Sequence, residues 1–149
     1  MDSVCRTNFY LRKYKNKTKI LKNSMVELIY PELSYKIVGC LFEVYKNIGP
    51  NHRERYYQNA LKEEFLKRKI KFQEQFPIKI TYKDKKIGQN YFDFLIDDKI
   101  ILEIKTGPYF KKDYLDQLLS YLKATYLKLG IIANFTRNGV KFHRVINIK

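Results

Sequence analysis

Apolar side chains recur at helical spacing in three stretches of the chain. The stretches cover residues 32–48, about 53–69 and about 112–128, and each follows the 3.6-residue period of an amphipathic helix. Gly49-Pro50 ends the first stretch, because proline cannot continue a helix. The apolar stripes consist of Ile37, Val38, Leu41, Phe42, Tyr45 and Ile48; of Tyr57, Ala60, Leu61 and Phe65; and of Leu115, Leu118, Leu119 and Leu122.

Outside these helices the pattern is that of strands. Residues 76–82 alternate apolar and polar side chains, residues 83–86 are a polar turn, and a second strand runs from Ile87 through Asp93. A turn at residues 97–99 leads into a third strand, which ends at residues 106–108. Residues 131–135 and 140–148 form the last two strands, with a turn at residues 137–139. The order α-α-β-β-β-α-β-β predicts an α/β (α+β) fold, one mixed sheet with helices packed against it.

Residues 1–24 are basic and show no clear periodicity, and the organised pattern begins at Met25. Residues 25–149 are therefore predicted to form a single domain, large enough for a sizeable core. Two interpretations of residues 1–24 stay open. Either Met25 is the true initiator, or these residues are a disordered basic arm that touches a phosphate backbone.

The composition limits the class of protein. An apolar content of 45% is typical of a globular protein, and no apolar run approaches the 18 residues of a membrane span. Residues 1–22 lack the apolar core of a secretion signal. Cys5 and Cys40 have no CxxC spacing, so they favour a reduced cytoplasmic protein over a disulfide or zinc scaffold.

The net charge of +15 is the strongest global signal in the sequence. Such an excess of lysine and arginine favours polyanionic partners, of which nucleic acid is the main class. The alternative is that the lysines reflect base composition and solubility. The chain also has 13 tyrosines and 10 phenylalanines, of which some could stack on bases and most are expected in the core.

One group of charged residues interrupts the apolar strands. Glu103 and Lys105 are two residues apart, so on a strand they point to the same face. Asp93 lies on the preceding strand, which a hairpin at residues 97–99 folds back beside Glu103. Charged side chains are rare in apolar strands unless they are paired or bind a metal. Two carboxylates and one ammonium are therefore predicted to meet at one place.

This group has the chemistry of a site for a hard divalent cation. Mg²⁺ prefers carboxylate and carbonyl oxygens, so Asp93, Glu103 and the carbonyl of Ile104 are candidate ligands. A metal-bound water could attack phosphorus, and Lys105 could orient that water or stabilise charge on the phosphate. The alternative is a simple ion pair between Glu103 and Lys105 on a solvated strand face.

The predicted helices offer further polar candidates. Gln117 and Tyr121 are four residues apart and share one helix face, although Tyr121 could equally be a core residue. Glu54 could be another metal ligand, or it could only complement a helix dipole in the first turn. His52 is a candidate contact for a substrate phosphate, whereas His143 is interpreted as structural. Two histidines are too few for a zinc site, and the six glycines form no phosphate-binding loop.

Together these residues resemble the GxxExxY protein family, a group within the PD-(D/E)xK nuclease superfamily. The resemblance extends from about Leu28 to Ile148. It is carried by Tyr35-Lys36-Ile37-Val38-Gly39, Phe42-Glu43-Val44-Tyr45-Lys46, Gly49-Pro50, Glu54, Tyr57, Ala60-Leu61, Asp93, Glu103-Ile104-Lys105, Gln117-Leu118-Leu119, Tyr121-Leu122-Lys123-Ala124 and Asn134-Phe135. The glycine of the family name is replaced by Asn51, a residue that tolerates left-handed backbone angles.

The resemblance implies a restriction-endonuclease-like domain with an αβββαβ core and Mg²⁺- or Mn²⁺-dependent phosphodiester cleavage. It implies that Asp93 and Glu103 are metal ligands, that Lys105 is the catalytic lysine, and that Glu54 is the first-helix acid. Substrate contacts are then expected from residues around this centre, namely Gln117, Tyr121, Tyr57, His52, Lys111 and Lys112.

The predicted function is hydrolysis of DNA, preferred over RNA, by a metal-dependent nuclease. The alternatives are a nucleic-acid-binding module that keeps the fold without turnover, and an interaction protein whose lysines are only compositional. No membrane partner is predicted. Many nucleases of this fold dimerise, and whether this chain forms a homodimer stays open, as does the choice between endonucleolytic and exonucleolytic cleavage.

Overall fold

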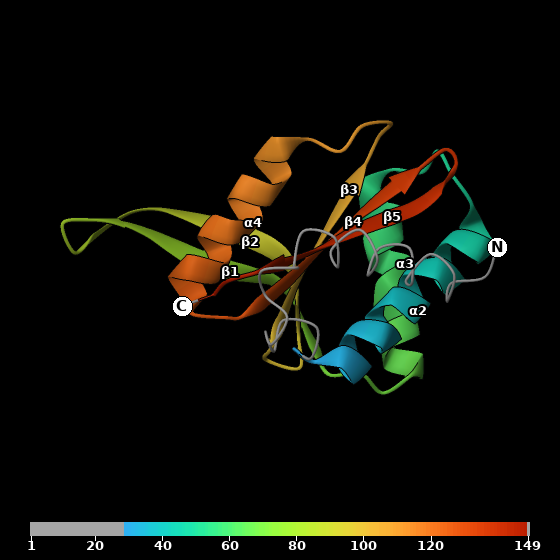
Figure 1. The fold of residues 1–149 in the computed structure, drawn as a ribbon, viewed down its shortest axis with the longest axis horizontal. Helices are drawn as coiled ribbons and strands as arrows, with labels where there is room; N and C mark the ends of the chain where they lie inside the picture. The colour runs from blue at the N-terminus through green and yellow to red at the C-terminus, as the bar shows by residue number, and fades with distance from the viewer. Residues whose placement is uncertain (1–28, 149) are drawn as a thin grey trace, which may run out of the picture.

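The computed structural model describes residues 29–148, so the predicted basic extension at residues 1–24 lies outside the described part. Three helices and five strands form in residues 29–148, in the predicted order (Figure 1). None of these helices is long and apolar enough to cross a membrane. The elements are α2 (Pro31–Ile48), α3 (Glu54–Lys67), β1 (Phe72–Tyr82), β2 (Lys85–Ile96), β3 (Ile100–Thr106), α4 (Lys112–Thr125), β4 (Leu129–Thr136) and β5 (Gly139–Ile146).

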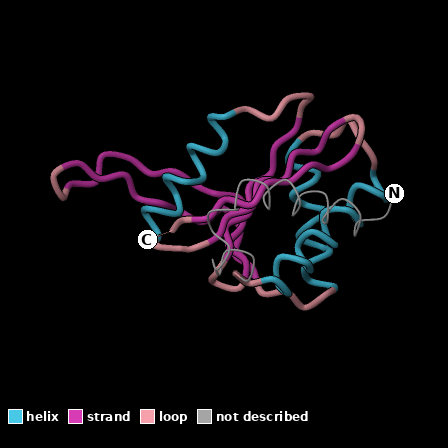
Figure 2. The backbone as a smooth tube through the Cα atoms, in the orientation of Figure 1, coloured by secondary structure: helices cyan, strands magenta, loops and turns pink. Residues whose placement is uncertain are grey.

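The strands form one mixed sheet in the order β1-β2-β3-β4-β5. Neighbouring strands are antiparallel except β3 and β4, which are parallel and are connected by α4. A parallel pair needs such a crossover, because a tight turn can only join antiparallel strands. Helices α2 and α3 pack on one face of the sheet and α4 on the other (Figure 2). The predicted α/β (α+β) fold is confirmed.

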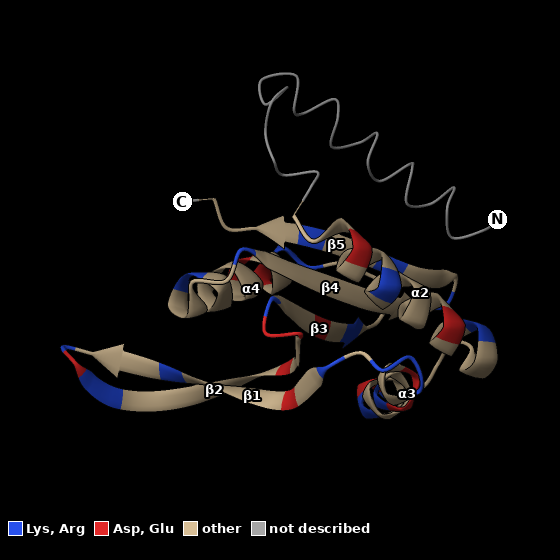
Figure 3. Cartoon of the chain, turned by 90° about the horizontal axis from the view of Figure 1, so that it is seen from below, with Lys and Arg blue, Asp and Glu red and all other residues tan. Residues whose placement is uncertain are grey.

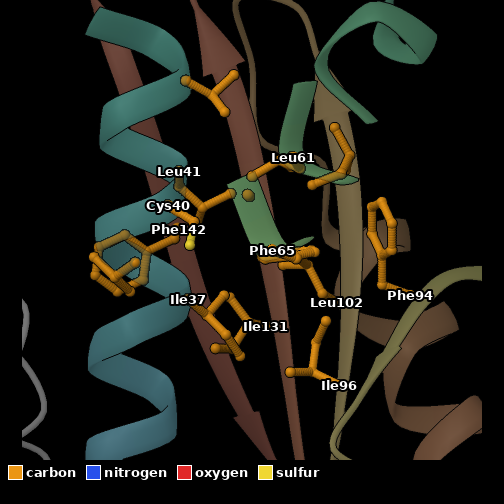
Figure 4. Close-up of a cluster of buried hydrophobic side chains, with 14 of the residues drawn as sticks. Ile37, Cys40, Leu41, Leu61, Phe65, Phe94, Ile96, Leu102, Ile131 and Phe142 are labelled. Atoms are coloured by element: carbon orange, nitrogen blue, oxygen red, sulfur yellow. The ribbon is translucent and has the colours of Figure 1, made fainter. Parts of the chain in front are cut away.

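The larger hydrophobic core lies between the sheet and the helix pair α2 and α3 (Figure 4). The smaller core lies under α4. Strand β3 is buried on both faces: Leu102 and Ile104 point into the larger core, and Ile101 points into the smaller one. Because side chains alternate along a strand, Glu103 and Lys105 lie on the α4 face together with Ile101.

In β1 and β2 the alternation of side chains between the two faces of the sheet is interrupted at one place. Phe72 and Phe94 belong to the larger core, whereas Phe76 and Phe92 stack on each other in the smaller core, with ring centroids 5.1 Å apart. Between the two phenylalanines of β1, Gln75 has a left-handed backbone with φ 47°. The β1–β2 pairing skips Gln75 and Asp93, which its register would place opposite each other.

Beyond this level the two strands leave the body of the sheet as a long hairpin. Their pairing continues to Tyr82 and Lys85, and the turn lies at Lys83 and Asp84 (Figure 1). We call residues 79–90 the hairpin arm. The sequence pattern predicted this hairpin and its turn, but it placed the start of β1 at residue 76 rather than at Phe72.

Helix α4 packs so closely on the sheet at position 130 that only glycine fits there. A Cβ atom there would lie 2.7 Å from both Cδ atoms of Leu118 and 2.8 Å from its Cγ. Leu118 is 1% exposed and cannot move away freely. We therefore expect Gly130→Ala to lower the free energy of unfolding by about 1–3 kcal/mol, measured by urea denaturation.

Gly88→Ala is the matched control, because its Cβ would meet only Ile80, at an ordinary 3.8 Å. This variant should keep wild-type stability to within about 0.5 kcal/mol. Equal losses in both variants would contradict the role of the contact between Gly130 and Leu118.

Candidate active site

The candidate site lies where β2 separates from β3. Ladder pairing between the two strands covers only residues 94–96 and 100–102. Beyond these residues, side chains replace the backbone hydrogen bonds of the ladder. The backbone N–H of Asp93 donates to Oε1 of Glu103 at 3.0 Å. In return, the backbone N–H of Ile104 donates to Oδ2 of Asp93 at 2.7 Å. The two carboxylates are thus adjacent, as the predicted hairpin at residues 97–99 requires.

This gap also exposes backbone groups of β3 to the site. The N–H and C=O of one strand residue point to the same edge, and the N–H of Ile104 points towards Asp93. The carbonyl of Ile104 therefore faces the side from which β2 has departed. That orientation is the one a carbonyl ligand beside Asp93 and Glu103 would need.

Lys105 lies on the same face as Glu103, with Nζ 4.0 Å from Oε2. Its ammonium also lies over the ring of Tyr114, 4.8 Å from the ring centroid. Glu103 is only 5% exposed, so its ion pair with Lys105 does not lie on a solvated strand face. Lys105 is held between a buried carboxylate and an aromatic face, close to the surface.

Helix α3 supplies a third carboxylate. Glu54 is the first residue of α3, is half-buried, and lies close enough to Asp93 and Lys105 for their charges to affect its pKa. One turn later, the Gln58 side chain lies close enough to the carboxylate of Asp93 to lower its pKa. The interpretation of Glu54 as a helix-dipole residue is therefore insufficient, because its side chain belongs to the same charge cluster.

Burial raises the pKa of all three carboxyls, and the charge of Asp93 adds to the shift at Glu103 and Glu54. Burial, followed by the charge of Asp93, raises the pKa of Glu103 to about 8. Burial likewise raises the pKa of Asp93, although the N–H of Ile104 and the charge of Lys105 oppose the shift. Burial and then the charge of Asp93 raise the pKa of Glu54. The cluster holds more potential negative charge than Lys105 balances.

The residues present fit a hard divalent cation by their chemistry. Three carboxylates and a strand carbonyl are the oxygen donors that Mg²⁺ and Mn²⁺ prefer, and surplus buried negative charge is what a cation relieves. Their present spacing is looser than that of a formed metal site. Within residues 29–148, no three Asp, Glu, His or Cys side chains meet closely enough to hold an ion as they stand.

Comparisons with known proteins show the superfamily of this chain. The family profile described as the PD-(D/E)XK nuclease superfamily matches residues 31–145. The chain belongs to the PD-(D/E)XK nuclease superfamily. A search of curated proteins gives no match.

Two solved structures are similar to the superfamily domain found here. The crystal structure of SSO0001 is 20% identical, with a TM-score of 0.50, covering 83% of this chain and 60% of that one. The alkaline exonuclease LHK-Exo from Laribacter hongkongensis is 13% identical, with a TM-score of 0.48, covering 63% of this chain and 56% of that one. The chain thus spans less than two thirds of either structure, and the likeness concerns the fold.

Helix α4 brings one of its two predicted residues to the PD-(D/E)XK centre. Tyr121 is 4% exposed and packs against Phe92. Its pKa is raised by burial and then by the charges of Glu103 and Asp93, so its hydroxyl lies near both carboxylates. Gln117 lies one turn earlier and is exposed.

The start of α4 carries the two predicted basic residues. Lys111 and Lys112 are exposed, and Nζ of Lys111 lies 5.9 Å from the ring centroid of Tyr114. The same ring lies under Lys105. Tyr114 therefore links the candidate catalytic lysine to the basic start of α4.

The other two predicted substrate contacts lie where α2 connects to α3, His52 in the connection itself and Tyr57 in the first turn of α3. Tyr57 is 1% exposed, stacks on Phe135 at 4.0 Å, and donates its hydroxyl hydrogen to the carbonyl of Gly49 at 2.7 Å. These contacts give Tyr57 a structural role, and a contact between Tyr57 and substrate stays a prediction. His52 bonds through Nε2 to the carbonyl oxygen of Ile48 at 2.6 Å, which gives it a structural role in this connection. Asn51 adopts the left-handed conformation expected of it, with φ 68°.

Three polar residues of the site were missed from the sequence. Gln58 and Gln75 both lie close enough to the carboxylate of Asp93 to lower its pKa. Asn134 pairs with Lys105 across the β3–β4 ladder, is 1% exposed, and its Oδ1 accepts no hydrogen bond within the described chain. For Gln58 a signal existed, because it lies four residues after Glu54 on the same helix face. Gln75 gave none, since its role depends on a left-handed backbone in a strand.

We expect Glu103→Gln to stabilise the protein in EDTA. Glutamine keeps an oxygen that can accept the N–H of Asp93 and removes the titratable carboxyl. The pKa of Glu103 is raised from 4.5 to about 8 by folding, so between these pH values the folded state keeps a proton that the unfolded state releases, and stability falls as pH rises. At pH 7 the gain in free energy of unfolding should reach at most roughly 3 kcal/mol, measured by urea denaturation.

Glu63→Gln on the exposed face of α3 is the control, because it removes one charge without burial. It should change stability by less than about 0.5 kcal/mol. A Glu103→Gln protein that is no more stable than this control would show that Glu103 is not under electrostatic strain.

Proposed function

We propose that this chain is a divalent-metal-dependent nuclease that hydrolyses phosphodiester bonds of DNA. The observation that carries the proposal is the cluster of Asp93, Glu103 and Lys105 at the separation of β2 from β3. Membership of the PD-(D/E)XK nuclease superfamily supports the reaction class. On the segments quoted above, we place the chain in the GxxExxY family within that superfamily.

Asp93, Glu103, Glu54 and the carbonyl of Ile104 are the residues that would hold Mg²⁺ or Mn²⁺. When bound, such an ion lowers the pKa of a coordinated water and polarises the phosphate. The amide groups of Gln58 and Gln75 favour the ionised form of Asp93, because both lower its pKa. The buried surroundings of Glu103 strengthen every electrostatic interaction made there, since little water screens it.

Lys105 acts on the substrate itself. Its ammonium lies 4.0 Å from the Glu103 carboxylate and keeps part of its surface in solvent, so one donor can reach a phosphate oxygen or the attacking water. A cation there stabilises the charge that develops on the phosphate in the transition state. The ring of Tyr114 limits where the ammonium can move.

Substrate binding is assigned to the exposed polar residues at the start of α4. Lys111 and Lys112 can contact phosphates beside the scissile one, and Gln117 can hydrogen-bond the backbone one turn along the helix. Tyr121 is buried, so we assign it a supporting role beside the carboxylates and no contact with substrate. The net charge of +15 favours nucleic acid as the substrate, and DNA is proposed over RNA. An intracellular location and homodimer formation remain predictions.

One observation favours a second candidate, a nucleic-acid-binding module without turnover. Asp93 and Glu103 each direct one oxygen to a backbone N–H, which satisfies part of their bonding capacity without a cation. Such a module would bind DNA equally well in EDTA and cleave none.

Cleavage assays with Mg²⁺, Mn²⁺ or EDTA decide between the two. Single-stranded, duplex and branched substrates of DNA and of RNA should be compared. We expect DNA cleavage with a metal and none in EDTA. We expect Lys105→Ala to reduce the cleavage rate by about 10²–10⁴-fold while the folded structure persists, because a charge that acts in the transition state is lost.

Lys67→Ala at the end of α3 is the matched control, since this lysine is exposed and belongs to no part of the site. Its rate should equal that of the wild type. Cleavage by Lys105→Ala at the control rate would overturn the assignment, and unchanged binding without any cleavage by the wild type would select the non-catalytic module.

A further inference from the structure

The hairpin arm, residues 79–90, extends beyond the packed part of the molecule (Figures 1 and 3). Ile78 is the last residue of β1 buried under α4, and every later residue of β1 is exposed. The two strands remain paired from Lys79 and Gln89 to the tip at Tyr82 and Lys85. At about 3.3 Å per residue, the arm reaches roughly 15 Å past Ile78. Nothing in the core requires a ribbon of this length.

The charge of the arm is strongly basic. Lysine occupies positions 79, 83, 85 and 86, and Asp84 is its one acid, which leaves a net charge of +3. None of these lysines belongs to a salt bridge within the described residues. Four exposed ammonium groups on a narrow ribbon make a surface that fits phosphates on both sides of it.

A chain of hydrogen bonds leads from the tip towards the candidate site. Nζ of Lys86 donates to Oε1 of Gln89 at 2.6 Å, and Nε2 of Gln89 donates to the hydroxyl oxygen of Tyr91 at 2.7 Å. Tyr91 is 53% exposed and lies two residues before Asp93. The hydroxyl of Tyr91 accepts this bond and so keeps its own hydrogen for a substrate. One face of the arm is therefore an ordered row of polar groups.

The dimensions of the arm select one form of nucleic acid. The major groove of B-form DNA is about 12 Å wide and admits a two-stranded β-ribbon. The major groove of A-form RNA is deep and narrow, so side chains cannot read it. We propose that the hairpin arm enters the major groove of duplex DNA, with its lysines on the flanking phosphates and the Gln89–Tyr91 row facing the groove.

Strand β2 joins the arm to the site and sets the distance between them. Lys86 and Asp93 are seven residues apart on β2, which corresponds to about 23 Å. At 3.4 Å per base pair, the arm contacts the duplex about seven base pairs from the phosphate at Asp93. Only this position of the cut rests on the proposed function, and the binding of the arm to DNA does not.

A second copy of the chain is the competing occupant, because Ile80, Tyr82 and Ile87 are exposed on the arm. Two arms of net charge +3 repel each other, and lysines along an edge strand such as β1 prevent strand pairing between molecules. Charge complementarity therefore favours DNA.

The test is fluorescence anisotropy in EDTA, in which binding is measured without turnover. The variant Lys83→Gln/Lys85→Gln/Lys86→Gln should bind a 30-base-pair DNA duplex about 10- to 100-fold more weakly than the wild type at 100 mM salt. Its plot of log affinity against log salt should lose up to roughly 2.7 units of slope, about 0.9 for each phosphate contact. Its stability should be unchanged, since these side chains are exposed.

The matched control is Lys36→Gln/Lys46→Gln/Lys67→Gln on α2 and α3, at the other end of the molecule (Figure 3). It removes the same charge and should keep most of the affinity and the salt slope. Equal losses in the two triple variants would overturn the inference, because net charge alone would then explain binding.

A duplex with glucosylated hydroxymethylcytosine, which fills the major groove, tests the groove directly. The wild type should lose most of its advantage over the arm variant on this duplex. A constant ratio between the two proteins, or equal losses on single-stranded DNA and duplex RNA, would overturn the proposal. Binding through the arm without cleavage by the wild type would refute the proposed function alone. If the wild type cleaves DNA and the arm variant binds DNA as tightly as the wild type, only the proposal for the hairpin arm is refuted.

Discussion

The structure depends on two reciprocal hydrogen bonds at the point where β2 leaves β3. Asp93 accepts from the N–H of Ile104, and Glu103 accepts from the N–H of Asp93. Buried backbone groups need partners, so two strands can separate inside a domain only if side chains replace the missing ladder. The carboxyl oxygens of Asp93 and Glu103 accept these two bonds. The same bonds hold both acids in place beside Lys105, so the local solution to a folding problem also assembles the site.

The cost of this arrangement is electrostatic. Glu54, Asp93 and Glu103 share one half-buried region, and each has a raised pKa because burial disfavours its ionised form. Grouped carboxyls with perturbed pKa values are typical of functional sites rather than of optimised cores. Lys105 offsets part of the repulsion, and a divalent cation would offset the rest. Stability and proposed activity therefore place opposite demands on Glu103.

One backbone residue connects this site to the hairpin arm. The left-handed Gln75 breaks the side-chain alternation of β1, so Phe72 and Phe76 pack into different cores. Its side chain lies close enough to the carboxylate of Asp93 to lower the pKa of that group. Strained backbone conformations of this kind concentrate at functional sites, where surrounding structure holds them. Here the strained residue lies beside the acids and four positions before the hairpin arm on the same strand.

The sequence by itself determined the helices and strands and the grouping of Asp93, Glu103 and Lys105. Periods of 3.6 and 2 residues located the helices and strands, and the turn at residues 97–99 placed Asp93 beside Glu103, because a tight hairpin has only one register. Local patterns do not show which face of an element meets which neighbour. The sequence therefore did not show that Tyr57 packs on Phe135, which is 78 positions away. Gln58, Gln75 and Tyr114 joined the site only through contacts between distant segments. Tertiary packing decided these roles, because burial and charge proximity depend on all the elements around a side chain and not on its own segment.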